Sequence, residues 1–163
     1  MADSRFTSTA LGAIRSAQEN AARLGHSYVG SEHLLLGLAS LEYSPVAQAL
    51  RRAGADRKTL RAGVVQRVGV GVPARCPRQG LTPRCCQAIR GAAEESRRLG
   101  QRTVSAEHLL LGLLEETDSG AFQVLDGCGV DIPALYRQVT ASLGGEETTP
   151  RFRTREPESR QGD

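Results

Sequence analysis

Two glutamates with the same neighbours are the residues of this chain whose type and spacing suit ligand binding. Glu32 and Glu107 both open the run Glu-His-Leu-Leu-Leu-Gly-Leu, 75 positions apart (residue 107 against residue 32). A carboxylate in the first turn of a helix lies beside backbone N–H groups that have no partner within the helix. The carboxylate accepts hydrogen bonds from a guanidinium, and the N–H groups donate to a phosphate. The alternative is purely structural, since an acid there stabilises the helix by about 0.3–1 kcal/mol.

The histidines and cysteines predict neither a metal site nor a nucleophile. His33 and His108 follow the two glutamates, but no second ligand stands four residues away, so we expect hydrogen-bonded core histidines. The four cysteines form no C-x-x-C pair, and we expect reduced thiols. Cys85 falls on an apolar stripe without an activating neighbour, which favours a core thiol. We therefore predict no catalytic residue, no metal and no cofactor, and that the chain is not an enzyme.

Length, charge and hydropathy limit the classes of function. A chain of 163 residues has no room for a nucleotide-hydrolysing core together with a substrate domain. The net charge of +3 is too small, and the basic residues too scattered, to indicate nucleic acid. No apolar run approaches the ~20 residues of a membrane span, and the first residues lack a signal peptide. We predict a cytoplasmic protein that binds neither membranes nor nucleic acid.

The spacing of the two motifs belongs to an internal repeat. Shifted by 75 positions, residues 6–38 align with residues 81–113 without a gap, and matches continue as far as Asp56 and Asp131. A gapless match of this length indicates a tandem duplication. We predict one domain over residues 1–143, with repeat one at about 5–66, a linker rich in glycine and proline at 67–80, and repeat two at about 81–143. Residues 144–163, which are poor in apolar side chains, are predicted to form a disordered tail.

Each repeat is predicted to form four helices, so the chain is all-α with about eight helices. Apolar residues recur every three or four positions along 6–24 and 81–99. Gly25 and Gly100 are expected to end these helices in the left-handed conformation, and Thr82 before Pro83 predicts a capped start. We expect the second helices to begin at Gly30 or Ser31 and at Ser105, the third helices near 44–52 and 119–126, and the fourth at Asp56 and Asp131.

The repeated motif resembles the Clp N-terminal domain family, whose paired four-helix repeats precede the ATPase modules of bacterial ClpC and ClpA unfoldases. The resemblance is carried by residues 23–38 and by their copy at 98–114, covers roughly residues 5–143, and looks closer to the ClpC branch. It implies two repeats related by pseudo-two-fold symmetry. The chain lacks the G-x-x-x-x-G-K-[ST] loop of the ATPase modules, so we expect a free-standing N domain that unfolds no protein by itself.

The resemblance also implies a ligand. In ClpC-like domains this motif holds phosphoarginine on proteins marked for degradation, once per repeat. By resemblance, Glu32 and Glu107 would face the guanidinium, and Ser31 with the helix N–H groups would face the phosphate. The second copy departs from the first because Ala106 stands at the position of Ser31. There, Ser105 either compensates or serves only as the helix cap.

These observations predict a monomeric recognition module of the Clp protease system. Its expected partners are phosphoarginine-tagged or unfolded substrate proteins, Clp adaptors, or Clp ATPase and peptidase subunits. One alternative is an accessory subunit that binds the ATPase or peptidase core without reading a tag. A nucleic-acid-binding regulator is the other alternative, motivated by the 20 arginines that accompany the single Lys58.

Overall fold

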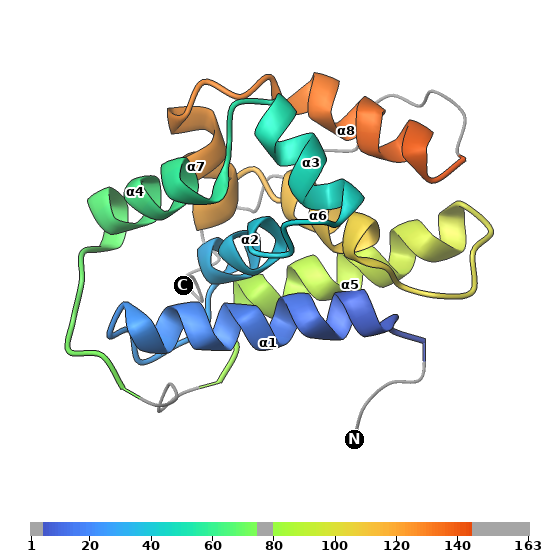
Figure 1. Ribbon diagram of the computed structural model, residues 1–163. Coiled ribbons are helices and arrows are strands. Elements are labelled where there is room, and N and C mark those ends of the chain that lie inside the picture. Colours follow the sequence, from blue (N-terminus) through green and yellow to red (C-terminus); the bar gives the residue numbers. More distant parts are fainter. Residues whose placement is uncertain (1–4, 75–79, 145–163) are drawn as a thin grey trace.

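The computed structural model describes residues 5–74 and 80–144, which form eight helices (Figure 1). The predicted all-α class with eight helices is confirmed, and the described residues contain no strand beyond two isolated bridges. Most of the predicted tail and residues 75–79 of the predicted linker lie outside the described residues. The helices of repeat one are α1 (Ser8–Arg23), α2 (Ser31–Ala39), α3 (Pro45–Arg52) and α4 (Arg57–Val68), and those of repeat two are α5 (Pro83–Arg98), α6 (Ala106–Glu115), α7 (Gly120–Gly127) and α8 (Ile132–Ser142).

Local capping chemistry sets the ends of the helices at equivalent positions in both repeats. The long helices α1 and α5 begin after Thr7 and Thr82, whose hydroxyls accept backbone N–H groups at 3.1 Å in both cases. They end before Gly25 and Gly100, which have φ values of 74° and 72°. A side-chain oxygen caps each third and fourth helix in the same way, from Ser44, Ser119, Asp56 and Asp131. The predicted starts and stops are confirmed.

The second helix of each repeat lies at the centre of the molecule, with the other helices packed around it (Figure 1). Its consecutive leucines are at most 1% exposed because helices from both repeats cover it on all sides. Gly37 and Gly112 bring α2 and α6 close to the long helices. A Cβ atom at these positions would lie 2.2 Å from the Ala13 carbonyl oxygen and 2.1 Å from that of Ala88.

The two repeats exchange short extended segments, which gives the molecule its pseudo-two-fold symmetry. Phe6 of repeat one pairs with Val104 of repeat two, and Val29 pairs with Leu81. The two pairs are equivalent in the repeat: Phe6 aligns with Leu81, and Val29 aligns with Val104. Four backbone hydrogen bonds of 2.7–3.2 Å hold the two crossings. Each repeat thus contributes one partner to both crossings.

In the described part of the chain, every helix is too short or too polar to cross a membrane.

Candidate functional site

Two clefts occupy equivalent positions on the two repeats. The first cleft, of about 580 Å³, is lined by Tyr28, Glu32, Arg67, Val68, Arg84, Asp118 and Gly120. The second cleft, of about 590 Å³, is lined by Thr7, Thr9, Leu41, Glu42, Tyr43, Ser44, Pro45, Ser105 and Glu107. In each cleft the motif glutamate comes from the first turn of the second helix of one repeat. The third helix of the other repeat begins on the opposite side, at Gly120 or Pro45.

Glu32 lies deep in the first cleft because two glycines make room for it. Its side chain is on α2, and the residue is 3% exposed. A Cβ atom at Gly30 would lie 2.1 Å from Glu32 Oε1, and one at Gly120 would lie 2.0 Å from Glu32 Oε2. The carboxylate is therefore held against the N-terminus of α7, where a negative charge is favoured by the helix dipole. Arg67 Nε is near the same point, 3.4 Å from the Cβ position of Gly120.

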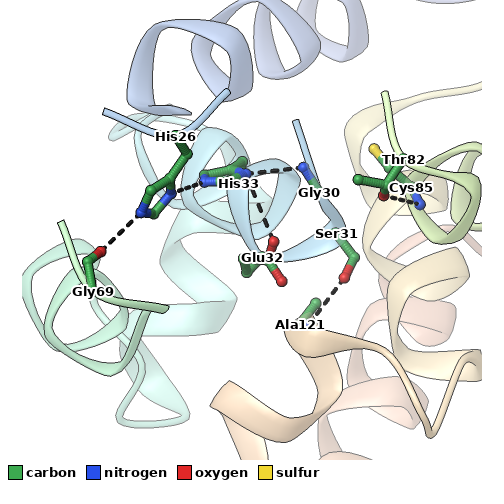
Figure 2. Close-up of polar contacts among 9 residues, drawn as sticks. All are labelled: His26, Gly30, Ser31, Glu32, His33, Gly69, Thr82, Cys85 and Ala121. Carbon is green, nitrogen blue, oxygen red and sulfur yellow. Dashed lines mark hydrogen bonds and ion pairs between the residues drawn. The ribbon is translucent and has the colours of Figure 1, made fainter. Parts of the chain in front are cut away.

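Ser31 serves the contact between the repeats. The residue is fully buried, and its hydroxyl oxygen accepts a hydrogen bond of 3.2 Å from the backbone N–H of Ala121 in the first turn of α7 (Figure 2). Its side chain thus positions α7 across the first cleft and is not part of the cleft lining. Ala106 occupies the same position in repeat two and is also fully buried. Because this position is buried outside the cleft, the replacement of serine by alanine at Ala106 does not change the lining of the second cleft.

Ser105 and Glu107 are more accessible than their counterparts in repeat one. Both are partly exposed and line the second cleft. Ser105 is also the cap of α6, and its hydroxyl oxygen accepts from the backbone N–H of His108 at 3.4 Å. Tyr43, 92% exposed, borders the cleft at the position that Asp118 holds in the first cleft. The structure therefore places Glu32 in the lining of one cleft and Ser105 with Glu107 in the lining of the other, whereas Ser31 is outside the lining and contacts α7.

A chain of hydrogen bonds through two histidines supports the helix start that carries Glu32. His33 Nδ1 accepts the backbone N–H of Gly30 at 2.9 Å, and His33 Nε2 is 2.7 Å from His26 Nδ1 (Figure 2). His26 Nε2 is 2.8 Å from the carbonyl oxygen of Gly69, just after α4. These partners require a proton on the Nε2 atom of both rings and none on Nδ1. Burial and the neighbouring His26 lower the pKa of His33 to about 4, so His33 is neutral near pH 7 and forms no ion pair with Glu32.

Repeat two has the same arrangement with an amide in place of one imidazole. His108 Nδ1 accepts the backbone N–H of Ser105 at 2.9 Å, and His108 Nε2 is 2.6 Å from Gln101 Oε1. Gln101 in turn donates to the carbonyl oxygen of Leu143 at the end of α8, at 2.7 Å. Burial lowers the pKa of His108 as well, and Glu95 partly opposes this shift. The prediction that both histidines are hydrogen-bonded core residues is confirmed.

The thiols and carboxyl groups of the described residues form no metal centre. No group of three or more histidine, cysteine, aspartate or glutamate side chains is arranged to hold a metal ion in residues 5–74 and 80–144. Cys85 is fully buried on α5, as predicted, and Cys86 and Cys128 are free thiols at partly buried positions. Cys76 lies outside the described residues.

Sequence reasoning did not single out the two arginines of the first cleft. Arg67 comes from the end of α4 in repeat one and Arg84 from the first turn of α5 in repeat two. Their counterparts in the alignment of the repeats, Ser142 and Thr9, are uncharged. A comparison of the two repeats could have identified these arginines, because charged residues in one copy stand opposite uncharged residues in the other. It marks the first cleft as a place where a carboxylate and guanidinium groups line one cavity.

Comparison with known proteins agrees with this architecture. The family model described as the Clp repeat (R) N-terminal domain matches the chain twice, at residues 5–80 and 80–158. The chain is 39% identical over 140 residues to an ATP-dependent Clp protease ATP-binding subunit ClpA homolog of Cyanidium caldarium, covering 86% of this chain and 16% of that protein. It is 36% identical over 162 residues to the chloroplastic chaperone protein ClpC1 of Arabidopsis thaliana, covering 93% of this chain and 17% of that protein.

Solved structures show the same fold. The N-terminal domain of the chaperone ClpD from Arabidopsis thaliana superposes with a TM-score of 0.77 at 26% identity, covering 89% of this chain and 98% of that domain. The ClpV N-domain in complex with a VipB peptide superposes with a TM-score of 0.64 at 18% identity, covering 88% of this chain and 91% of that one. The chain thus spans about a sixth of the curated relatives and nearly all of the solved domains. The two matches to the family model, together with the identity to Clp ATP-binding subunits over most of its length, show that this chain belongs to the Clp N-terminal repeat domain family.

Proposed function

We propose that the chain is a non-catalytic recognition module of the Clp protease system that captures proteins carrying phosphorylated arginine. The observation that supports it most directly is the lining of the first cleft, where the carboxylate of Glu32 shares one cavity with the guanidinium groups of Arg67 and Arg84. A phosphorylated arginine carries a guanidinium that donates hydrogen bonds and a phosphoryl group that accepts them. The cleft offers a partner for each.

The arginines would also supply selectivity. Arg84 Nη1 is buried without a hydrogen-bond partner among the described residues, so it has donor capacity for a phosphoryl oxygen. An arginine without the phosphoryl group would bring a third positive charge to a cleft that already holds Arg67 and Arg84 beside two carboxylates, Glu32 and Asp118. Like charges in a half-buried cleft repel, so the unmodified side chain would bind more weakly. In this proposal Ser31 positions α7 opposite Glu32.

The second cleft would bind the same ligand with different groups. Glu107 would accept hydrogen bonds from the guanidinium. The hydroxyl-bearing residues Ser105 and Thr9 line this cleft, and Thr9 stands at the position that Arg84 holds in the first cleft. Neutral hydroxyls form weaker hydrogen bonds to a phosphoryl group than guanidinium groups do. We therefore expect the first cleft to bind phosphoarginine more tightly than the second.

The comparisons support peptide capture at the level of the fold. The ClpV N-domain, which has this fold, was solved with a bound VipB peptide, and several curated relatives are ATP-binding subunits of the Clp protease. We infer that this chain likewise binds segments of substrate or adaptor proteins. We also propose that it acts in the cytoplasm as a monomer, although one of its relatives, ClpC1 of Arabidopsis thaliana, is chloroplastic.

Isothermal titration calorimetry with free phosphoarginine tests the proposal. Glu32→Gln should weaken binding to the first cleft by about ten- to a hundredfold, because a charge-assisted hydrogen bond contributes about 1.5–3 kcal/mol. Glu107→Gln should remove the weaker site, and the double variant should bind nothing measurable. Glu19→Gln, on the exposed surface of α1, removes the same charge away from both clefts and should bind as the wild type does.

Two results would count against this function. Undetectable binding of phosphoarginine by the wild-type chain would overturn it, as would equal affinity for free arginine and phosphoarginine. In that case a pull-down that retains Clp ATPase or peptidase subunits, without clients whose binding phosphoarginine competes away, would favour the accessory-subunit alternative.

A further inference from the structure

A groove between α4 and α7 continues from the first cleft. The two helices belong to different repeats and contact each other (Figure 1). The volume of this α4–α7 groove is about 700 Å³, against about 580 and 590 Å³ for the two clefts. Residues of both helices line it: Thr59, Ala62, Gly63, Gln66, Arg67, Gln123, Val124, Gly127 and Cys128. Arg67 lines both the groove and the first cleft, so the two cavities meet at its side chain.

Glycines on both helices leave the α4–α7 groove open. Gly63 of α4 faces α7, since a Cβ atom there would lie 3.0 Å from Val124 Cγ1. A Cβ atom at Gly127 of α7 would meet no atom of the described residues within 4 Å. The equivalent contact in the other half of the molecule joins α8 to α3, and it has Gln138 and Arg52 at these two positions. Long side chains therefore stand there where the α4–α7 groove has none.

The groove combines an apolar floor with amide groups from both helices. Val124 is 5% exposed, and burial raises the pKa of the Cys128 thiol, which is therefore uncharged near pH 7. Gln66 of α4 and Gln123 of α7 line the groove and are exposed. An amide side chain both donates and accepts hydrogen bonds, so it suits the N–H and C=O groups of an extended peptide. The floor and the amides together match a peptide segment with apolar side chains.

The length of the groove matches a short extended segment. Thr59, Gly63 and Arg67 follow one another in steps of four residues, so they lie on one face of α4. Eight residues of helix rise about 12 Å, which is the length of three or four residues of extended chain. Arg67 is at the end of the groove that meets the first cleft. A peptide whose phosphoarginine occupies that cleft therefore has room for its next residues along the groove.

We propose that the α4–α7 groove binds the three or four residues on one side of the phosphoarginine in a captured protein, and that it selects apolar side chains there. The inference rests on the function proposed for the first cleft and adds the sequence context that this cleft prefers. Burial of an apolar side chain on the floor strengthens binding in proportion to the area removed from water. A phosphoarginine in the second cleft would lack this contribution, because Gln138 and Arg52 stand at the equivalent contact.

Calorimetry of the whole chain with three kinds of probe tests the proposal. The probes are free phosphoarginine, a peptide with phosphoarginine between glycines and serines, and peptides in which valine and leucine replace these residues on one side or the other. In Glu107→Gln, which keeps the first cleft, apolar residues on one of the two sides should tighten binding about tenfold over the glycine–serine peptide. In Glu32→Gln, which leaves the second cleft, they should make no difference.

Two substitutions at one position separate the volume of the groove from the backbone effect of losing a glycine. In the Glu107→Gln background, Gly127→Gln puts a long uncharged side chain into the lining. The apolar peptide should then lose its tenfold advantage, while free phosphoarginine binds as before. Gly127→Ala leaves most of the groove empty and should keep most of the advantage. We expect both variants to fold, because a Cβ atom at Gly127 meets no atom of the described residues.

Four results would overturn the proposal. Equal affinity of Glu107→Gln for the apolar and the glycine–serine peptides, with free phosphoarginine still bound, would refute the groove and leave the function of the cleft intact. Undetectable binding of free phosphoarginine by the wild type would refute both. An apolar peptide without phosphoarginine that binds as tightly, and that phosphoarginine does not displace, would make the groove an independent docking site. A changed oligomeric state of Gly127→Gln in sedimentation would assign the groove to a second copy of the chain.

Discussion

The histidine of each motif acts through its hydrogen bonds and not through its charge. Its Nδ1 atom accepts the backbone N–H of the helix cap, and its Nε2 atom reaches a side chain that holds the end of the fourth helix. The motif glutamate is thereby fixed at the start of a helix that is anchored at a second point in the same repeat. At the scale of single residues, the histidine positions the glutamate and does not itself line the cleft.

Acid should destabilise the chain through His33. Its pKa is lowered to about 4 from an ordinary value of 6.5, mainly by burial, so the unfolded chain binds a proton that the folded chain does not. The unfolding free energy should therefore decrease as the pH falls from 6.5 toward 4, by about 3 kcal/mol from this residue. An NMR titration of the imidazole nitrogens checks it. Titration of His33 near pH 6.5 would contradict the neutral hydrogen-bonded chain.

Arg84 should determine selectivity for the phosphoryl group. Replacing it with glutamine keeps a donor but removes the charge, so phosphoarginine should bind the first cleft about tenfold or more weakly, while free arginine should bind no worse. The equivalent Thr9→Gln tests the second cleft, where no guanidinium is lost. Calorimetry of both variants with both ligands measures this. A loss of the same size for the two ligands after Arg84→Gln would show that Arg84 does not contact the phosphoryl group.

At the scale of helices, close packing of the second helix on the first explains why each leucine run contains a glycine. Gly37 and Gly112 lie against backbone carbonyl oxygens of α1 and α5, where a side chain has no space. The same contact fixes the position of the second helix, and with it the glutamate in its first turn, relative to the long helix of the same repeat. Glycine is therefore required here for packing, in spite of its low helix propensity.

Alanine at these two positions should reverse the usual effect of removing a helical glycine. We expect Gly37→Ala and Gly112→Ala to lower the unfolding free energy by about 2 kcal/mol or more, as overpacked cores do. Gly127→Ala in α7, where a Cβ atom would meet open space, should instead raise it by about 0.5–1 kcal/mol. Urea unfolding of the three variants provides the test. Stabilisation by Gly37→Ala would mean that α1 and α2 are not in close contact.

At the scale of the whole molecule, the repeats depend on each other. The extended segments around Phe6 and Leu81 pair across the repeats, and the Ser31 hydroxyl caps a helix of repeat two. Both clefts are lined by residues of both repeats. The ligand site is consequently a property of the assembled pair, and neither repeat contains a complete cleft.

The two repeats should unfold together. A chain ending at residue 74 lacks every hydrogen bond and apolar contact that crosses between the repeats, and it exposes the leucines of α2 that α5, α6 and α7 cover. We expect this fragment to show no cooperative unfolding transition in urea by circular dichroism, whereas residues 1–163 should unfold in a single transition. Two separate transitions in the full chain, or a cooperatively folded fragment, would contradict this interdependence.

The sequence alone determined the duplication, the helical class and the ends of most helices. Helix caps act over three or four residues. Thr82 before Pro83, and the glycines after the long helices, therefore predict helix ends without knowledge of the rest of the chain. The position of Glu32 and Glu107 in first turns follows from the same local chemistry. The helical periodicity also placed Cys85 and the leucine runs in the core.

Only the tertiary structure decided what surrounds these glutamates. Arg84 and Asp118 reach the first cleft from the other repeat, and the Ser31 hydroxyl accepts a hydrogen bond from the backbone of α7. A periodic pattern identifies the buried face of a helix but not the helix that will cover it. Contacts between segments distant in sequence arise only once the two repeats have packed around a common core.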